Sequence, residues 1–427
     1  MTLPSIHISP DHSSPIYTIT QGNLTKGDSI SRLDSTLQLV VHKLLEGRDV
    51  DFTEACLLEK ATPSELPGLC EASRHIRDIG KGSTISFSPK VFIPLTHLCR
   101  DFCDYCTFRQ SPTEASSLFL SPEQVLTIAK AGQKLGCTEA LFTLGERPEQ
   151  RYPEAKAWLQ KRGFKSTLDY LTFVCSLVLN ETTLLPHSNP GTMSRIEMSN
   201  LKEVNVSLGV MLETLSLNLT KPGQPHHRAP SKWPNVRRKT LDLAGRLKIP
   251  FTTGILTGIG ESKIDRIEAL WAIKQSNKTY GHIQEVIIQN FQAKKSTPMA
   301  HHPNPPLHDT LWTTAVARLI LGPDINIQVP PNLNSKTYPL FLLAGINDWG
   351  GISPLTKDFV NPESPWPTLA TLNKETTAYG LNLKPRLPIY PEYFMNKHDF
   401  VSSSLRSNIS RLVDTDGFVK GGINRYV

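Results

Sequence analysis

Three of the seven cysteines in this 427-residue chain stand within eight residues, in the run THLCRDFCDYCTF (96–108). Cys99, Cys103 and Cys106 follow the spacing C-x3-C-x2-C. Four thiolates complete a closed zinc site or occupy every iron of a 4Fe-4S cluster, whereas three leave one metal position free for another ligand. The spacing therefore predicts a metal site whose chemistry depends on what fills that last position.

The main alternative is a structural zinc knuckle in which His97 or Cys70 supplies the fourth ligand. Inert buried thiols are disfavoured, because the run RDFCDYC is too polar for a protein core. The cysteines outside the triplet occur singly in apolar patterns, and we expect them to be core residues: Cys56, Cys70, Cys137 and Cys175. Metal analysis distinguishes the two sites, since a 4Fe-4S cluster contains iron and a knuckle contains a single zinc.

The cysteine loop must be positioned by regular structure, and short apolar runs alternate with longer amphipathic ones along the chain. We expect strands at 85–95, 139–146, 171–179, 203–212, 249–260, 283–291 and 325–330. We expect helices at 122–136, 152–164, 235–248, 264–276 and 307–321. This alternation predicts an α/β fold, a TIM-type (β/α) barrel that is complete or partial. The cysteines would then follow the first strand, at the C-terminal mouth where active sites of this fold are built.

The remaining segments complete an expected organisation of four parts. Residues 1–34 are rich in Ser, Thr, Pro and His and predict a mobile leader, and 35–85 carry helical spacing and predict an N-terminal helical extension. The barrel is expected over 86–345. The proline-rich region that follows predicts a C-terminal cap and tail over 346–427.

Composition argues against several classes of protein. No run approaches the roughly 18 apolar residues of a membrane-spanning helix. The formal net charge of +7 is scattered and forms no long basic block, so we expect no nucleic-acid partner. An odd number of cysteines without a secretory signal indicates reduced thiols. We expect a cytoplasmic protein, or a plastid protein if the source is a photosynthetic eukaryote, because the leader leaves targeting open.

The cysteine triplet, with the aromatic Tyr105 directly before its last member, resembles the signature of radical S-adenosylmethionine (SAM) enzymes. This resemblance implies a 4Fe-4S cluster on the three cysteines, with SAM chelating the open iron through its amine and carboxylate. Gly145 and Glu146 resemble the family's GE motif for the methionine ammonium. By itself, a GE pair is more often a turn at the end of a strand.

A second run, GILTGIGE, resembles the family's G-x-I-x-G-x-x-E motif beside the adenine, on Gly254, Gly258 and Glu261. The charges of SAM also require partners: an ammonium in a dry cavity needs a carboxylate, which Glu146 could supply, and a carboxylate needs a guanidinium. Arg237, in RRKTLDLAG, resembles the arginine that holds the cofactor carboxylate in biotin-synthase-like members. A solvated charge on a helix is the equal alternative for this arginine.

Longer runs resemble a narrower family, the first subunit of 7,8-didemethyl-8-hydroxy-5-deazariboflavin synthase, over roughly residues 35 to 400. They include TLGERPE, GQPHHRAPSKWP, EVIIQNFQAK and AGINDWGGISPLTKDFVNPESPWP. The resemblance implies that a partner radical SAM subunit, 5-amino-6-(D-ribitylamino)uracil--L-tyrosine 4-hydroxyphenyl transferase, first forms an adduct. This subunit would then act as a lyase that closes the central ring with loss of ammonia, with an electron donor such as ferredoxin or flavodoxin. The alternatives are the partner's coupling reaction and a non-enzymatic metal-binding module.

Several polar residues at predicted strand ends or in loops are candidates for contacting this small-molecule substrate or for catalysis. They are Glu213, His226, Gln289, Asn290, Asn347 and Asp348. Asp348 is expected to orient the adduct or to transfer a proton, provided that its loop lies at the C-terminal mouth. For each residue a capped turn is an equally good interpretation.

Overall fold

The computed structural model describes residues 4–8, 17–21 and 29–427. The strands are β1 Pro4–Ile8, β2 Tyr17–Gln21, β3 Thr84–Thr96, β4 Glu139–Leu144, β5 Leu185–Asn189, β6 Ser207–Gly209, β7 Phe251–Thr257, β8 Ile283–Asn290, β9 Asn326–Gln328, β10 Asp348–Ile352 and β11 Asn382–Pro385. The helices are α1 Ser35–Leu45, α2 Phe52–Cys56, α3 Leu66–Lys81, α4 Pro122–Lys134, α5 Pro153–Lys161, α6 Thr167–Glu181, α7 Arg195–Lys202, α8 Pro234–Arg246, α9 Lys263–Tyr280, α10 Leu307–Leu321, α11 Leu369–Ala378, α12 Pro391–Met395 and α13 Ser403–Leu412. In the segment predicted as a leader, β1 pairs with β2 antiparallel, and a short 3-10 helix spans Ile30–Arg32 with Ile30 buried. Residues 1–3, 9–16 and 22–28 of this prediction lie outside the described residues.

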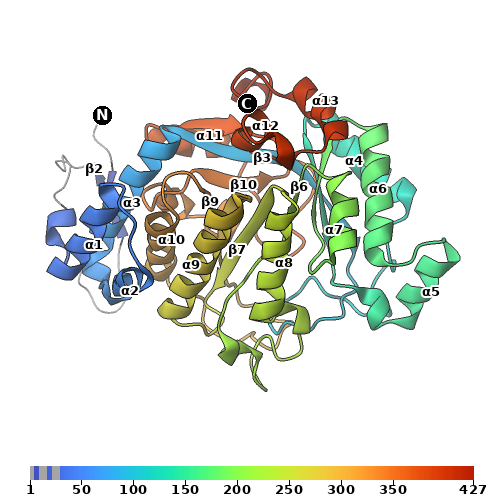
Figure 1. Cartoon of the computed structure of the whole chain (residues 1–427), viewed down its shortest axis with the longest axis horizontal. Helices are drawn as coiled ribbons and strands as arrows, with labels where there is room; N and C mark the ends of the chain where they lie inside the picture. Colours follow the sequence, from blue (N-terminus) through green and yellow to red (C-terminus); the bar gives the residue numbers. More distant parts are fainter. Residues whose placement is uncertain (1–3, 9–16, 22–28) are drawn as a thin grey trace.

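The eight parallel strands β3 to β10 form a closed barrel surrounded by helices (Figure 1). Each strand pairs with the next, and β10 closes the ring against β3, with Gly351 opposite Ser88. The predicted TIM-type barrel is therefore confirmed and is complete. Its last strand begins beyond the boundary expected at residue 345, because the two glycines of DWGGI look like a turn in the sequence.

One predicted strand was wrong. Residues 171–179 lie in α6, where Leu168, Leu171, Cys175 and Val178 are buried at helical spacing and Ser166 caps the first turn. The strand at this place in the barrel is β5, with the sequence LPHSN. Because this run is polar and contains a proline, the sequence does not predict a strand there.

The inward-facing side chains near the start of the strands are polar and charged. On β3, Val91 and Ile93 are fully buried apolar residues, whereas the alternate position Lys90 lies 3.0 Å from the carboxylate of Glu139. His187 on β5 is hydrogen-bonded to Ser207 at 2.5 Å, and burial lowers its pKa to about 4. A TIM barrel usually fills this space with branched apolar residues, so here hydrogen bonds must stabilise the interior.

The C-terminal segment covers this end of the barrel, where α11, α12 and α13 lie together at the top of Figure 1. Arg386, which follows β11, donates to Asp348 at 2.7 Å and to Glu285 at 2.8 Å. Tyr390 donates to the same Glu285 at 3.1 Å. Charged side chains from β8, β10 and the C-terminal segment therefore form one buried network.

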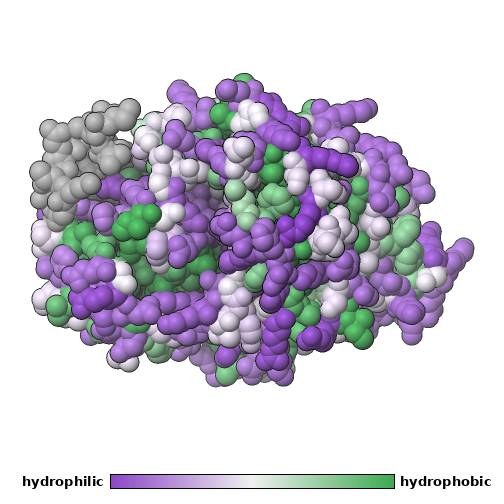
Figure 2. Space-filling view, turned by 45° about the horizontal axis from the view of Figure 1, so that its top comes forward, coloured by the Kyte–Doolittle hydropathy of each residue, from purple (hydrophilic) through white to green (hydrophobic). Residues whose placement is uncertain are grey.

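The outer surface in Figure 2 is mostly hydrophilic, with smaller apolar patches between the polar residues. Within the described residues, none of the helices combines the length and the apolar character needed to cross a membrane.

Candidate active site

The cysteine triplet lies in the loop that follows β3, at the end of the barrel opposite the buried charge network. The bridge between Leu98 and Gln110 closes the base of this loop. Cys99, Cys103 and Cys106 are all partly exposed free thiols, and they line one cavity of about 300 Å³. This cavity is the candidate active site, because it gathers residues from the carboxyl ends of several strands.

The donor set fits an iron-sulfur cluster better than a single ion. Within the described residues, no three His, Cys, Asp or Glu side chains are placed to hold one metal ion. Each cysteine of a 4Fe-4S cluster binds a different iron, so its thiolates need not converge on one point. The zinc alternative also lacks support, since Cys70 is buried in α3 and the Nδ1 atom of His97 lies 3.0 Å from the Phe108 carbonyl.

Gly145 and Glu146 pack directly against the cysteine loop. A Cβ atom at Gly145 would collide with the carbonyl oxygen of Leu98, so only glycine allows this approach. The backbone N–H of Glu146 donates to Cys99 Sγ at 3.2 Å. The Glu146 side chain is 5% exposed and lines the cavity, and its carboxylate accepts a hydrogen bond from the Thr192 N–H at 3.0 Å. The structure thus holds a fixed carboxylate beside the first cysteine.

Arg237 also lines the cavity and is only 4% exposed, so the alternative of a solvated helix charge is wrong. Its Nε donates to the Ser231 carbonyl at 2.6 Å and its Nη1 to the Met211 carbonyl at 3.3 Å. These bonds fix the side chain, and they leave guanidinium donors for an anionic ligand.

A buried ion pair, Glu213 with Lys232, forms part of the wall of the same cavity. Glu213, in a left-handed conformation with φ of 67°, pairs with Lys232. Burial alone would raise the pKa of Glu213, but the charges of Lys232 and Arg237 outweigh it and lower the pKa. A non-glycine residue in this conformation costs free energy and is often found at functional sites.

Tyr105 lines the cavity, whereas His226 lies behind it and is not a lining residue. The Tyr105 hydroxyl is 2.8 Å from Nε2 of His226, and burial lowers the pKa of His226 to about 4. A neutral, fully buried imidazole that contacts Tyr105 would position this ring rather than touch the substrate.

The glycine-rich run forms the end of β7 and the turn after it. Gly254 lies inside β7, and Gly258 has a φ of +89° that suits glycine. Glu261 accepts from the N–H groups of Gly258 at 2.7 Å and Ile259 at 2.8 Å, and from Arg266 at 2.7 Å. Its carboxylate therefore holds the turn together, and neither Glu261 nor the two glycines line the cavity.

The expectation that Asn347 and Asp348 contact the substrate is wrong. Asp348 is the first residue of β10, is fully buried and pairs with Arg386, and Asn347 accepts from Arg318 at 2.8 Å. The first residue of a barrel strand lies at the face opposite the mouth, so both residues are structural. Gln289 and Asn290, at the carboxyl end of β8, do line the cavity.

Several polar residues that line the cavity were not predicted from the sequence, among them Asn189, Lys232, Lys294 and Asn361. Asn189 ends the strand that was not predicted. Lys232 ends the short 3-10 helix Pro230–Lys232, whereas Lys294 and Asn361 lie in irregular loops. All three belong to runs that carried the family resemblance, but those runs gave no sign of which residues face the cavity.

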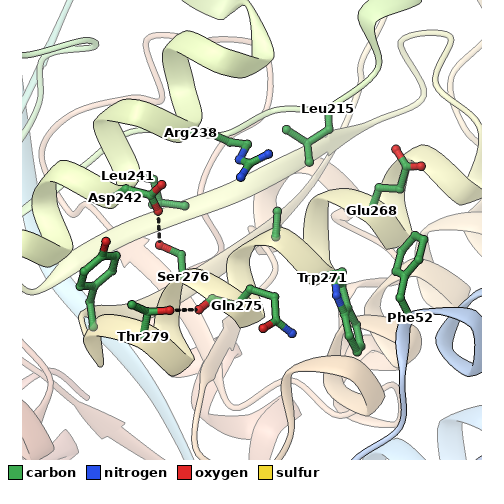
Figure 3. A pocket seen from close by; sticks show the side chains of 12 residues that line it. Phe52, Leu215, Arg238, Leu241, Asp242, Glu268, Trp271, Gln275, Ser276 and Thr279 are labelled. Atoms are coloured by element: carbon green, nitrogen blue, oxygen red, sulfur yellow. Dashed lines mark hydrogen bonds between the residues drawn. The ribbon is translucent and has the colours of Figure 1, made fainter.

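A larger hollow of about 600 Å³ lies between α8 and α9 (Figure 3). Trp271 and Phe52 form part of its wall, and Ser276 donates to Asp242 at 2.8 Å. None of the cysteines lines it. Size alone therefore does not identify the active site, and we assign the chemistry to the smaller cavity.

Residues 93–270 match the model of the radical SAM superfamily. The chain is 50% identical over 336 residues to 7,8-didemethyl-8-hydroxy-5-deazariboflavin synthase of Methanopyrus kandleri, covering 79% of this chain and 100% of that one. It is 47% identical over 391 residues to FO synthase of Nocardia farcinica, which covers 89% of this chain but 45% of that protein. The chain thus spans the whole of the first relative and about half of the second.

Two solved structures share the fold. The FeFe-hydrogenase maturase HydG of Carboxydothermus hydrogenoformans has a TM-score of 0.66 at 17% identity, covering 92% of each chain. Methylornithine synthase (PylB) has a TM-score of 0.61 at 19% identity, covering 81% of this chain and 97% of that one. At such low identity these likenesses bear on the fold alone.

Proposed function

The chain belongs to the family of 7,8-didemethyl-8-hydroxy-5-deazariboflavin synthases, which are radical SAM enzymes, and from this premise we propose that it catalyses the ring-closing step of deazaflavin formation. The substrate would be 5-amino-5-(4-hydroxybenzyl)-6-(D-ribitylimino)-5,6-dihydrouracil, and closure of its central ring would release ammonia. The enzyme would then be a carbon-nitrogen lyase. The observation that carries the proposal is that the cysteine triplet, Glu146 and Arg237 line one cavity.

In this proposal Cys99, Cys103 and Cys106 hold a 4Fe-4S cluster. A bound cluster would supply the reducing electron for cleavage of SAM, which is the source of the radical chemistry that the proposed ring closure needs. The residues of the chain would bind SAM and the adduct and orient them. Glu146 would accept from the SAM ammonium, and Arg237 would bind its carboxylate.

Tyr105, which stands in the cysteine loop and lines the cavity, would shape the SAM site directly, and Gly254, Gly258 and Glu261 would do so from outside the cavity wall. Glu261 would do so indirectly, through the turn that it holds. The partly enclosed cavity limits access of water to a reactive radical.

We propose that a second radical SAM unit, the 4-hydroxyphenyl transferase acting on tyrosine and 5-amino-6-(D-ribitylamino)uracil, supplies the adduct. FO synthases about twice as long as the matched region support this pairing. A ferredoxin or flavodoxin would provide the electron. All seven cysteines are free thiols, which suits a reducing compartment such as the cytoplasm.

An anaerobic assay tests the proposed function. The reconstituted protein is incubated with SAM, a reductant and the pre-formed adduct, and the fluorescent deazaflavin product is followed by fluorescence and mass. Product from the adduct is expected. Adduct formation from tyrosine and the aminouracil, without conversion of supplied adduct, would instead assign the coupling reaction to this chain.

Replacing Arg237 by methionine is expected to weaken SAM binding about tenfold to a hundredfold, because one charge-assisted hydrogen-bonding partner is worth roughly 1.5–3 kcal/mol. Isothermal titration with the cluster-loaded protein measures the change. Arg238→Met is the matched control, since its neighbour Arg238 is exposed and does not line the cavity. Equal SAM affinity in the two variants would show that Arg237 is not part of the SAM site.

A further inference from the structure

The loop of residues 353–366, which follows β10, lies over the mouth of the barrel as a roof. Its start and end are fixed to β3: Thr356 Oγ1 accepts from the Phe92 N–H at 3.0 Å, and Trp366 stacks on the Phe92 ring at 5.5 Å. Its middle is fixed to the cysteine loop, since Thr107, next to Cys106, donates to the Val360 carbonyl at 2.9 Å. We call residues 353–366 the roof loop.

The roof loop supplies part of the cavity wall. Val360 and Asn361 line the same cavity as the three cysteines. Lys294, which follows β8, also lines the cavity and forms an ion pair with Glu363 of the roof loop. The cavity is therefore bounded by the cysteine loop at one side and by the roof loop above.

Two amide side chains in this wall have unused hydrogen-bonding groups. Asn361 is 5% exposed, and its Nδ2 donates to Asp358 at 3.0 Å. Within the described part of the chain, its second amide hydrogen and its Oδ1 have no partner. Gln289 lines the cavity from β8, and its side chain makes no hydrogen bond to any described residue. By contrast, the neighbouring Asn290 accepts from Asn334 at 2.9 Å.

Asn361 is nearly buried, whereas Gln289 is partly exposed, and both line the cavity. Amide donors and acceptors in a cavity wall that have no protein partner need a ligand or water to satisfy them. A primary amide offers an N–H donor and a C=O acceptor side by side, which matches the alternating C=O and N–H groups of a pyrimidine-dione ring. The charged groups at the methionine end of SAM would have partners elsewhere in the cavity, at Glu146 and Arg237.

We propose that Asn361 of the roof loop and Gln289 of β8 bind the uracil ring of the adduct and hold it under the roof loop. This inference rests on the proposed function and names the residues that determine its substrate. The roof loop thereby contributes a substrate contact from a part of the chain that was expected to be a cap.

The test uses cluster-loaded full-length enzyme and the synthetic adduct. Gln289→Leu removes the amide at similar volume and breaks no hydrogen bond within the described structure. We expect kcat/KM for the adduct to fall about tenfold to a hundredfold, the loss of one well-placed hydrogen-bonding group. Iron content and SAM affinity should stay unchanged, and 5'-deoxyadenosine should exceed deazaflavin because cleavage is no longer coupled to product.

Asn361→Ala is expected to give the same pattern, and Lys357→Ala, an exposed position on the same roof loop, should behave as the wild type. Unchanged kcat/KM and coupling in Gln289→Leu would overturn the inference, as would equal losses in the Lys357 control. A wild-type enzyme that converts no adduct would overturn the proposed function instead, and the inference with it.

Discussion

Replacing Cys103 by alanine is expected to abolish SAM cleavage while leaving the barrel folded. Each thiolate would hold one iron, so two remaining cysteines cannot keep a site-differentiated 4Fe-4S cluster. Cys103 stands in a loop outside the barrel strands and its thiol is partly exposed, so its removal opens no cavity in the apolar core. The loss should therefore be chemical rather than structural.

Release of 5'-deoxyadenosine under reducing, anaerobic conditions measures the effect, together with iron content and circular dichroism. Cys175→Ala is the matched control. This cysteine is buried in α6, and its loss should cost about 1 kcal/mol or somewhat more of stability without changing SAM cleavage. Continued 5'-deoxyadenosine release by the Cys103 variant would show that the cluster assignment is wrong.

Replacing Asp348 by alanine is expected to lower the free energy of unfolding by roughly 3–5 kcal/mol, a large part of the stability of an ordinary domain. Asp348 accepts from Arg386 and from the Gly350 N–H at 2.5 Å, and all of these groups are buried. Its removal leaves the Arg386 guanidinium, among the described residues, with Glu285 as its one remaining ion-pair partner at the closed end of the barrel.

Urea denaturation gives the unfolding free energy of the variant. Asp399→Ala serves as the control, because its ion pair with Lys248 is 2.8 Å long but exposed to solvent, and its loss should leave the unfolding free energy close to that of the wild type. If Asp348→Ala kept its stability yet lost deazaflavin formation, the residue would have to act in the chemistry after all.

The features that could be predicted best are those in which the candidate functional residues directly follow a strand pattern in the sequence. The cysteine spacing and the apolar run before it predicted a loop after the first strand, and the structure has that loop. Gly145 and Glu146 were also predictable, because a strand pattern ends directly before them. These features depend on residues that are close together in the chain.

The errors concern residues whose position depends on distant parts of the chain. Asp348 looked like a mouth residue because DWGGI resembles a turn, and its partner Arg386 is 38 residues away. The β5 run LPHSN lacks apolar alternation, because its inward-facing His187 belongs to a polar barrel interior. A pattern search that expects apolar strands cannot find such positions.

Asn361 was missed for a related reason. It stands in a loop without regular structure, and only the closure of the barrel by β10 brings the roof loop over the cysteines. Family resemblance singled out the run that contains it but could not say which of its residues faces the cavity.

The pairing of β10 with β3, and the contacts that Arg386 makes near the strand starts, have a consequence for how the protein is made. The first barrel strand leaves the ribosome long before the strand that closes the ring and the segment that covers its base. At about 5–20 residues per second, the three thiols of the cysteine loop precede those late segments by some tens of seconds. During that interval the nascent chain holds these three thiols outside any finished cavity, so newly synthesised protein is expected to depend on a reducing environment until the fold is complete.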